Sequence, residues 1–410
     1  MIPKAELLAT ASELGLLPST VEKDYVLGWA LMAIAEHEPL SQWYFKGGTC
    51  LKKCYFDTYR FSEDLDFTIP GDSPYDKDSI RNSLIEIANT VREWTGVDFP
   101  TDGVEVRESE NKRGMPTFEA RMTFVGPMQL PRAQHQRIRL DLTQDELVVD
   151  PPEMRDVFHG YSDAPEAPLK VRCYSMAEIL SEKMRALYQR SGRARDVYDV
   201  INLTRNLRSE ISSARVHVLA QQKFAFKELE PPDPQRIIAR IDLGVLTNDW
   251  VQSLRHQLPV LPPVIEFHDA LEEALGWLLQ TSTGAKELSA ASKDASEITV
   301  GAPRFSVPTM ARRLGRAEVA CDLEMFGAGM DRIRYAARNR LLVGLTYHGV
   351  NRVVEPYSLR RLRTGKLLLY VYEVRRGSGA GGGIKAFKLS EISNAQVTST
   401  SFAPQHLIEL

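Results

Sequence analysis

Cysteine is scarce in this sequence, and long apolar runs are absent. The chain of 410 residues contains 4 cysteines, which excludes a scaffold held together by many disulfides. Cys50, Cys54, Cys173 and Cys321 show no metal-ligand spacing, and we expect Cys50 and Cys54 to be buried as small apolar residues. No apolar run reaches membrane-spanning length, and the N-terminus lacks a secretory pattern. These absences predict a protein of the reducing cytoplasm that makes no membrane contact.

Net charge is also nearly absent, but only when the chain is taken as a whole. The formal net charge is −3. Residues 301–410 hold 17 Lys and Arg against 8 Asp and Glu, a net +9, while the remainder holds 34 against 46, a net −12. A basic segment on an acidic body indicates nucleic acid as a partner. The alternative is an ordinary solvated basic face.

The most informative stretch is residues 45–69, which begins with Lys46-Gly47-Gly48-Thr49. Two adjacent glycines let the backbone turn tightly and approach a ligand without a Cβ in the way. Apolar residues then recur at helical spacing, so we expect the amides from Thr49 onward to begin a helix. A helix start presents unpaired N–H groups and a positive dipole end, which suit a phosphate. This pattern predicts a phosphate-binding turn.

Two carboxylates follow in the same stretch. Asp64 and Asp66 lie two residues apart in a predicted strand, so both side chains face one way while Leu65 and Phe67 face the core. Adjacent like charges are costly unless a cation lies between them, and carboxylate oxygens are ligands that Mg²⁺ prefers. Alone, the glycine pair is a common turn and the acidic pair a common strand edge. Together they indicate metal-assisted nucleotide chemistry.

The motif Gly47-Gly48-Thr49, followed by Arg60-Phe61-Ser62-Glu63-Asp64-Leu65-Asp66, resembles the nucleotidyltransferase toxins of the AbiEii/AbiGii abortive-infection group. These toxins belong to the DNA polymerase β-like superfamily. The resemblance implies Asp64 and Asp66 as ligands of Mg²⁺ (or Mn²⁺), and Lys46, Gly47, Gly48, Thr49 and Ser62 at a bound NTP. It also implies an RNA acceptor, most plausibly a tRNA 3′ end, and a separately encoded cognate antitoxin.

A third acidic residue lies on a predicted neighbouring strand. Residues 104–149 read as successive strands, one of them over 137–142, in which Asp141 faces away from the apolar residues. From the residues alone, Asp141 is more simply an ion partner of Arg139. The resemblance implies instead that Asp141 binds metal beside Asp64 and Asp66 and orients the attacking hydroxyl.

A second motif lies on two predicted helices. Ser175 and Glu178 form a capping box for a helix that reaches about residue 189. Lys183 lies on this helix, and Asp196 and Asp199 share a face of the next. Spacing alone favours a salt-bridged helix surface. The resemblance implies that Lys183 binds the triphosphate and that Asp196 or Asp199 helps hold the nucleotide site.

The C-terminal part combines a helix with short β-rich runs, which suggests a small β-barrel. Its sequence Arg352-Val-Val-Glu355-Pro356-Tyr357 resembles the WYL domain, a ligand-sensing module with an Sm-like barrel. The chain departs from that family by carrying Leu367-Leu368-Leu369 in place of the naming Trp-Tyr-Leu, and Glu391 where Arg is frequent. An arginine-rich helix and interleaved tyrosines predict binding of nucleic acid or a nucleotide. These tyrosines are Tyr335, Tyr347, Tyr357, Tyr370 and Tyr372, and the alternative is that several form the barrel core.

The predicted fold class is therefore α+β. We expect a polymerase β-like nucleotidyltransferase core over residues 1–205, a helical extension over 206–282, a linker over 283–309 and a WYL-like barrel over 310–410. The predicted reaction is nucleoside monophosphate transfer from an NTP to an acceptor in a toxin–antitoxin or phage-defence setting. The alternatives are transfer to a protein or small molecule, and a catalytically silent regulator that binds nucleotides or nucleic acid.

Overall fold

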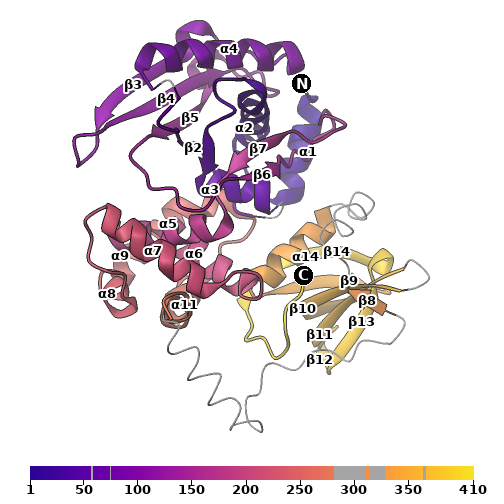
Figure 1. Ribbon diagram of the computed structural model, residues 1–410. Coiled ribbons are helices and arrows are strands. Elements are labelled where there is room, and N and C mark those ends of the chain that lie inside the picture. The colour runs from indigo at the N-terminus through magenta and orange to yellow at the C-terminus, as the bar shows by residue number, and fades with distance from the viewer. Residues whose placement is uncertain (57–58, 74, 281–310, 314–327, 363–365) are drawn as a thin grey trace.

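The computed structural model describes residues 1–56, 59–73, 75–280, 311–313, 328–362 and 366–410. A mixed sheet with covering helices forms the N-terminal part, a group of helices follows, and a second sheet with one long helix forms the C-terminal part (Figure 1). None of the helices in these ranges has the length and apolar character that crossing a bilayer requires. The predicted linker, residues 283–309, lies outside the described residues.

The N-terminal sheet has seven strands in the order β3-β4-β5-β2-β1-β7-β6. β2 pairs antiparallel with β1 and parallel with β5, so it lies in the middle of the sheet. The sequence predicts strands over residues 118–125 and 137–142, and the structure confirms them as β4 and β5. The bounds are β1 (Tyr44–Lys46), β2 (Asp64–Thr68), β3 (Val104–Glu110), β4 (Pro116–Phe124), β5 (Gln136–Thr143), β6 (Glu153–Asp156) and β7 (Lys170–Cys173).

Helices α2 (Pro18–Glu36) and α4 (Lys77–Thr95) cover the apolar side of this sheet, and α1 (Lys4–Leu14) packs on α2. Figure 1 places α4 over β3, β4 and β5. The sequence predicts that the second helix starts at Val21 after a Ser or Thr cap, but it starts at Pro18. Proline suits the first helical position because its missing N–H would have no helical partner there. The sequence also predicts an amphipathic helix over residues 76–96, which α4 confirms, with the Asp76 carboxylate capping two amides.

The glycine motif forms a compact turn between β1 and β2. Helix α3 (Gly47–Cys50) begins two residues earlier than the Thr49 start that the sequence predicts, and the π-helical turn η1 (Leu51–Tyr55) follows it. Gly47 has a φ of 79°, in the left-handed region that favours glycine. The π-helical turn lies between the glycines and β2, and such turns are frequent at functional sites.

The helical group spans residues 176–278, which confirms the prediction of a mostly helical segment after residue 205. Ser175 accepts the Glu178 amide and caps α5, and Ser191 and Gly192, both with positive φ, separate α5 from α6. The single helix predicted over residues 266–279 is two, divided at Ala270. The bounds are α5 (Met176–Gln189), α6 (Ala194–Leu207), α7 (Ser213–Phe226), α8 (Pro234–Ile238), α9 (Leu243–Leu254), α10 (Val264–Asp269) and α11 (Leu271–Leu278).

The C-terminal part is a curled antiparallel sheet with helix α14 (Ala328–Arg338) packed against it (Figure 1). Its order is β12-β11-β10-β9-β14, with β13 also on β11 and β8 on β10. Within the described residues no ladder joins β13 to β14. The bounds are β8 (Ala311–Arg313), β9 (Leu341–Tyr347), β10 (Val350–Leu362), β11 (Leu367–Arg376), β12 (Gly379–Ala380), β13 (Ile384–Lys388) and β14 (Ile392–Ser401).

Helix α14 joins the second sheet to the rest of the molecule. The Tyr335 hydroxyl donates to the Val260 carbonyl at 2.5 Å, and the Tyr198 hydroxyl donates to Asn339 Oδ1 at 3.1 Å. The Arg332 guanidinium donates to the Glu13 carbonyl. Since Tyr198, Tyr335 and Asn339 are all buried, the C-terminal part docks on the N-terminal body through a packed interface.

This packing corrects the expected role of three tyrosines. Tyr335, Tyr357 and Tyr370 are buried, so the prediction that they stack on bases is wrong, and the alternative of a core role holds for them. Two arginines of the basic segment are also internal. Arg352 pairs with Glu373 and Arg360 with Glu409, each pair buried. Part of the positive charge counted in the sequence therefore stabilises the fold and does not reach the surface.

Candidate active site

The three predicted metal-binding carboxylates lie on two adjacent strands. Leu65 and Phe67 are fully buried, which turns Asp64 and Asp66 of β2 to the opposite side of the sheet. In the parallel pairing of β2 with β5, Asp66 lies directly opposite Asp141 and Asp64 opposite Arg139. The prediction that Asp141 occupies a strand beside the acidic pair is therefore confirmed. Arg139 also approaches Asp64, with 3.7 Å between Nε and Oδ1.

Burial, with mutual repulsion as a second cause, changes the acidity of these carboxylates. Burial, followed by the negative charges of Asp66, Asp64 and Glu119, raises the pKa of Asp141 to about 6. Burial is also the main cause that raises the pKa of Asp66, with Asp64 adding to it and the positive charges of Lys46 and Lys183 opposing it. Negative charge at this point exceeds what the neighbouring side chains neutralise. Such a donor set fits a divalent cation.

The glycine pair brings the backbone against these carboxylates. A Cβ on Gly47 would collide with the Asp66 carboxylate, and a Cβ on Gly48 would lie 2.6 Å from Arg60 Nη2 and 2.9 Å from Ser62 Oγ. Both positions therefore require glycine for close approach. The structure thus brings together the predicted residues Gly47, Gly48 and Ser62 at the start of β2.

Replacing Gly47 with alanine is expected to disturb the site directly. The added methyl group would meet the Asp66 carboxylate, and alanine is strained at a φ of 79°. We expect a loss of stability of about 1–3 kcal/mol together with a much larger relative loss of metal affinity. Urea unfolding and calorimetric metal titration measure the two effects. Gly71→Ala is the control, because a Cβ there meets nothing within 4 Å.

Two further predicted nucleotide-binding residues make contacts inside the protein. The Thr49 hydroxyl, which is buried, donates to the Asp64 carbonyl at 2.5 Å and ties the glycine turn to β2. The Lys46 ammonium lies 5.6 Å from the centre of the Tyr174 ring and 3.9 Å from Glu146 Oε1. Lys46 is thus held at the edge of the site, near Asp66, by an aromatic face and a carboxylate.

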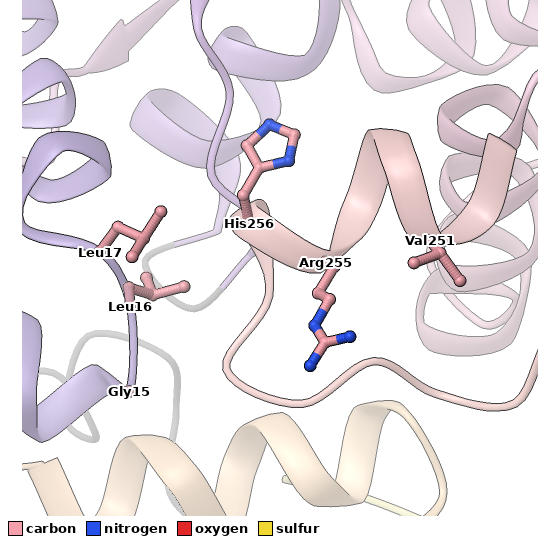
Figure 2. A pocket seen from close by; sticks show the side chains of 6 residues that line it. All are labelled: Gly15, Leu16, Leu17, Val251, Arg255 and His256. Atoms are coloured by element: carbon pink, nitrogen blue, oxygen red, sulfur yellow. The ribbon is translucent and has the colours of Figure 1, made fainter.

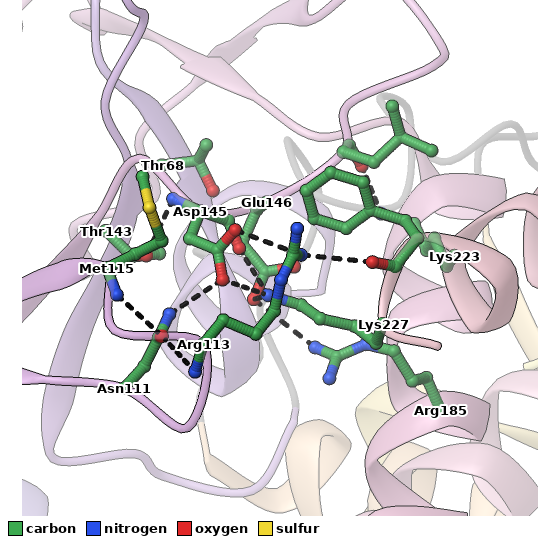
Figure 3. Close-up of polar contacts among 12 residues, drawn as sticks. Thr68, Asn111, Arg113, Met115, Thr143, Asp145, Glu146, Arg185, Lys223 and Lys227 are labelled. Carbon is green, nitrogen blue, oxygen red and sulfur yellow. Dashed lines mark hydrogen bonds and ion pairs between the residues drawn. The ribbon is translucent and has the colours of Figure 1, made fainter. Parts of the chain in front are cut away.

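Glu146 also belongs to a charged network between the sheet and the helical group, shown in Figure 3. Its Oε1 lies 3.4 Å from Arg185 Nη2 of α5 and 3.8 Å from Lys227 Nζ, just beyond α7. The neighbouring Asp145 pairs with Arg113 at 3.1 Å and with Lys227 at 3.0 Å. These contacts fix the loop after β5, and hence the carboxylate that faces Lys46.

The second predicted motif forms a buried ionic cluster. Lys183 Nζ lies 2.8 Å from Asp199 Oδ2 and 3.4 Å from Asp196 Oδ1. Asp199 also accepts from Arg60 Nη2 at 2.7 Å and from the Tyr59 hydroxyl at 2.9 Å. Burial of Asp199 is outweighed by these cations, which hold its pKa well below the usual range. The cluster joins the helical group to the segment that leads into β2.

Sequence reasoning missed several residues of this arrangement. The buried Asp199 requires a cation, and Arg60 supplies it. The sequence does not indicate this pairing, because the two residues lie 139 positions apart. Glu119 lies opposite Asp141 in the pairing of β4 with β5. Its position on the polar side of a predicted strand was a signal for that placement. No local signal marks Glu146 as the partner of Lys46.

A pocket of about 460 Å³ lies near the site but contains none of the predicted residues. Figure 2 shows its lining, which combines the turn between α1 and α2 with the end of α9 and the residues after it. His256 of this pocket pairs with Glu63 at 2.8 Å, and Glu63 precedes Asp64. The lining residues are Gly15, Leu16, Leu17, Val251, Arg255 and His256.

Comparison with known proteins identifies the family of this chain. The sequence model described as "Nucleotidyl transferase AbiEii toxin, Type IV TA system" matches residues 29–280. Among curated proteins, none matches the chain. A solved structure of MenT4, a nucleotidyltransferase toxin of Mycobacterium tuberculosis H37Rv, is similar with a TM-score of 0.47 and 17% identity, over 71% of this chain and 94% of that one. The family match covers more than half of the chain, including every predicted site residue, so this protein belongs to the AbiEii family of nucleotidyltransferase toxins of type IV toxin–antitoxin systems.

Proposed function

We propose that this nucleotidyltransferase moves a nucleoside monophosphate from an NTP to the 3′ hydroxyl of an RNA, the 3′ end of a tRNA, with Mg²⁺ or Mn²⁺ as cofactor. The observation that carries the proposal is the set of three same-face carboxylates on β2 and β5, beside a glycine turn. In this proposal residues 1–205 form a polymerase β-like core and 206–282 its helical extension.

The carboxylates Asp64, Asp66 and Asp141 would hold the metal ions. Burial first, and then repulsion by Asp66 and Asp64, raises the pKa of Asp141, and a bound cation would offset both effects. When bound, the metal supplies charge neutralisation on the triphosphate and on the attacking oxygen. Asp141 lies beside Asp66 at the more exposed edge of the trio. We assign it to orient the acceptor hydroxyl and accept its proton.

The nucleotide would lie along the glycine turn. Because Gly47 and Gly48 have no Cβ, a phosphate can approach their peptide groups beside Asp66. Lys46 would pair with a phosphate oxygen, and Ser62 lies against Gly48 where it could donate a hydrogen bond. Thr49 would act by holding the turn on β2 through its bond to Asp64. The product pyrophosphate would leave from this side.

Lys183 would contact the triphosphate from the helical group. Its charge acts on Asp66, so it lies near the metal site, while Asp196 and Asp199 hold its ammonium from the other side. In this assignment Asp196 and Asp199 are positioning residues. They orient Lys183 and do not themselves touch the nucleotide.

The RNA acceptor is supported by arginines on the same face as the carboxylates. Arg139 of β5 lies opposite Asp64 of β2 and opposite Arg121 of β4. Arg137 lies two residues earlier on the same face of β5. Each of these guanidinium groups has a carboxylate neighbour, Asp64 at 3.7 Å from Arg139 and Glu119 at 2.5 Å from Arg121. Both arginine side chains are partly exposed, so a phosphodiester strand crossing β5 and β4 would meet positive charge there and bring its end to Asp141.

Replacing Arg121 and Arg139 together with alanine is expected to weaken RNA use specifically. We expect kcat/KM for RNA to fall by about tenfold or more. The log–log dependence of RNA binding on salt should flatten by about 0.7 for each phosphate that the variant no longer neutralises. Affinity for NTP should be unchanged. Arg132→Ala is the control, because Arg132 is exposed and pairs with Asp102 away from β2. Equal RNA affinity in the double variant and the parent would contradict the proposal that RNA binds across β5 and β4.

Metal affinity is expected to depend on pH through Asp141. Its carboxyl has a pKa of about 6, so it is charged above that pH and protonated below it, where a proton competes with the cation. Affinity for Mn²⁺ should therefore fall by about tenfold per pH unit below 6. Calorimetric titrations between pH 5 and 7.5 measure the effect. In Asp141→Asn the affinity should be low throughout and this component of the pH dependence should be lost.

The C-terminal residues 310–410 are proposed to be a WYL-like domain with an Sm-like barrel. One helix followed by an antiparallel sheet, in which β9, β10, β11 and β13 pair in chain order and β14 returns to β9, supports this assignment. Its ligand is proposed to be a nucleic acid or nucleotide, bound by the arginines that the interior does not use. We further propose that the protein is cytoplasmic, acts with a cognate antitoxin and serves in phage defence.

Pyrophosphate release tests the proposal against its alternatives. With NTP, Mg²⁺ and total RNA, we expect release that requires all three components. Release with a protein fraction but not with RNA would favour nucleotidylation of a protein, and release with neither would favour a silent nucleotide-binding regulator. Lys183→Ala serves as a companion variant, for which weakened NTP binding is expected.

A further inference from the structure

Three of the four cysteines of the chain meet in one place. Cys50 ends α3, Cys54 lies in η1, and Cys173 ends β7. Their sulfur atoms all lie within 4.8 Å of one another, and all three residues are buried. The sequence predicts burial for Cys50 and Cys54, and this is confirmed. Cys173 lies more than a hundred residues away, so spacing could not reveal the trio.

We propose that Cys50, Cys54 and Cys173 form a binding site for one soft d¹⁰ metal ion, such as Zn²⁺ or Cu⁺. The donor set is all sulfur, which selects soft cations over Mg²⁺ or Ca²⁺. A metal–sulfur distance of about 2.3 Å places three sulfurs about 4 Å apart in a trigonal site. The observed separations need only small side-chain movements to reach that geometry.

A disulfide fits these positions less well. It requires two sulfurs about 2.05 Å apart and would leave the third thiol unused. Metal binding uses all three thiols without a change of oxidation state. Three S–H bonds break, three protons pass to solvent, and three sulfur–metal bonds form. No oxidant is required.

Two cations lie near the trio. Arg155 Nε lies 3.5 Å from the Cys54 carbonyl, and the buried Lys53, which directly precedes Cys54, pairs with Asp24 at 2.7 Å. Burial raises the pKa of the Cys50 and Cys173 thiols, so their thiolates would form only with the bound cation. Three thiolates with Zn²⁺ carry −1, and Arg155 is a cation close to that charge.

Such a site would fix the glycine turn. Cys50 directly follows Thr49, and the sheet that holds Cys173 also holds Lys46, since β7 pairs with β1. A bound ion would therefore pin α3 and η1 to β7. The consequence for catalysis rests on the proposed function, but metal binding itself does not.

The test uses the full-length chain with Cys321 replaced by serine, so that the trio holds the remaining thiols. Cys321 lies outside the described residues. The reduced, chelator-treated protein is titrated with Cd²⁺ as a spectroscopic stand-in, with long equilibration because the thiols are buried and open only locally. We expect one ion per chain, a sulfur-to-metal charge-transfer band and a higher melting temperature. Absorbance is read without NTP or RNA, so the outcome does not depend on nucleotidyl transfer.

The variants Cys50→Ala, Cys54→Ala and Cys173→Ala should each weaken binding by about a hundredfold or more. No band in the parent, or a band that persists in all three variants, would overturn the proposal and leave the trio as core packing. Should a variant fail to fold, thiol alkylation of the parent decides. Three thiols protected per bound ion support the site, whereas fewer than three contradict it.

Discussion

The Asp66→Asn variant should lose nucleotidyl transfer by about a thousandfold or more while remaining folded. Asp66 lies between Asp64 on its own strand and Asp141 on the neighbouring one, so it is placed to share metal ions with both. Removing one charge takes away several kcal/mol of transition-state stabilisation, and each 1.36 kcal/mol is tenfold in rate. Label transfer from an NTP and calorimetric Mn²⁺ binding measure the loss.

The fold of this variant should be unchanged or slightly more stable. The raised pKa of Asp66, caused mainly by burial, means that its charge is unfavourable in the metal-free protein. Glu105→Gln is the matched control, since Glu105 lies on the same sheet two strands from β5, pairs with Arg107 and is half-exposed. Retained transfer in Asp66→Asn would remove Asp66 from the catalytic set.

The Asp199→Asn variant should unfold far more readily than the parent. Asp199 is fully buried and accepts from Arg60 Nε at 2.8 Å and Nη2 at 2.7 Å, with Lys183 a further 2.8 Å contact. Asparagine would leave the buried Arg60 without a counter-charge and would leave Lys183 with Asp196 as its carboxylate partner, a change that costs about 3–5 kcal/mol. Urea unfolding measures the loss, and activity should fall in step with the folded fraction.

An exposed ion pair provides the control for this variant. Arg208 and Glu273 pair on the surface, so Glu273→Gln should change the free energy of unfolding by less than about 1 kcal/mol. Equal stability of Asp199→Asn and Glu273→Gln would contradict the assignment of Asp199 as a buried anchor.

The part of the site that was predictable follows from local patterns. Alternation in residues 64–69 places Asp64 and Asp66 on one side, and a glycine pair before an apolar period predicts the turn. The same alternation places Asp141 on the polar side of its strand. Its position opposite Asp66 depends on strand register, which alternation alone does not specify.

The rest depends on contacts between distant segments. No short stretch of sequence reveals that Arg60 pairs with Asp199. The same holds for the approach of Cys173 to Cys50 and Cys54. The polar strand β14 was not predicted, because its Ser, Thr and Asn residues give little apolar alternation. The sequence favours exposed tyrosines in the C-terminal part, but three of them are buried by packing against the sheet or α14.

The most direct test of the proposed reaction follows two labels in one experiment. The full-length protein is incubated with RNA, Mg²⁺ and an NTP labelled at either the α- or the γ-phosphate, and RNA and protein are separated afterwards. We predict that the α label appears in RNA at its 3′ end, that the γ label appears only in pyrophosphate, and that Asp66→Asn transfers neither. Label in protein, γ label in RNA, or equal labelling by Asp66→Asn would contradict the proposed reaction.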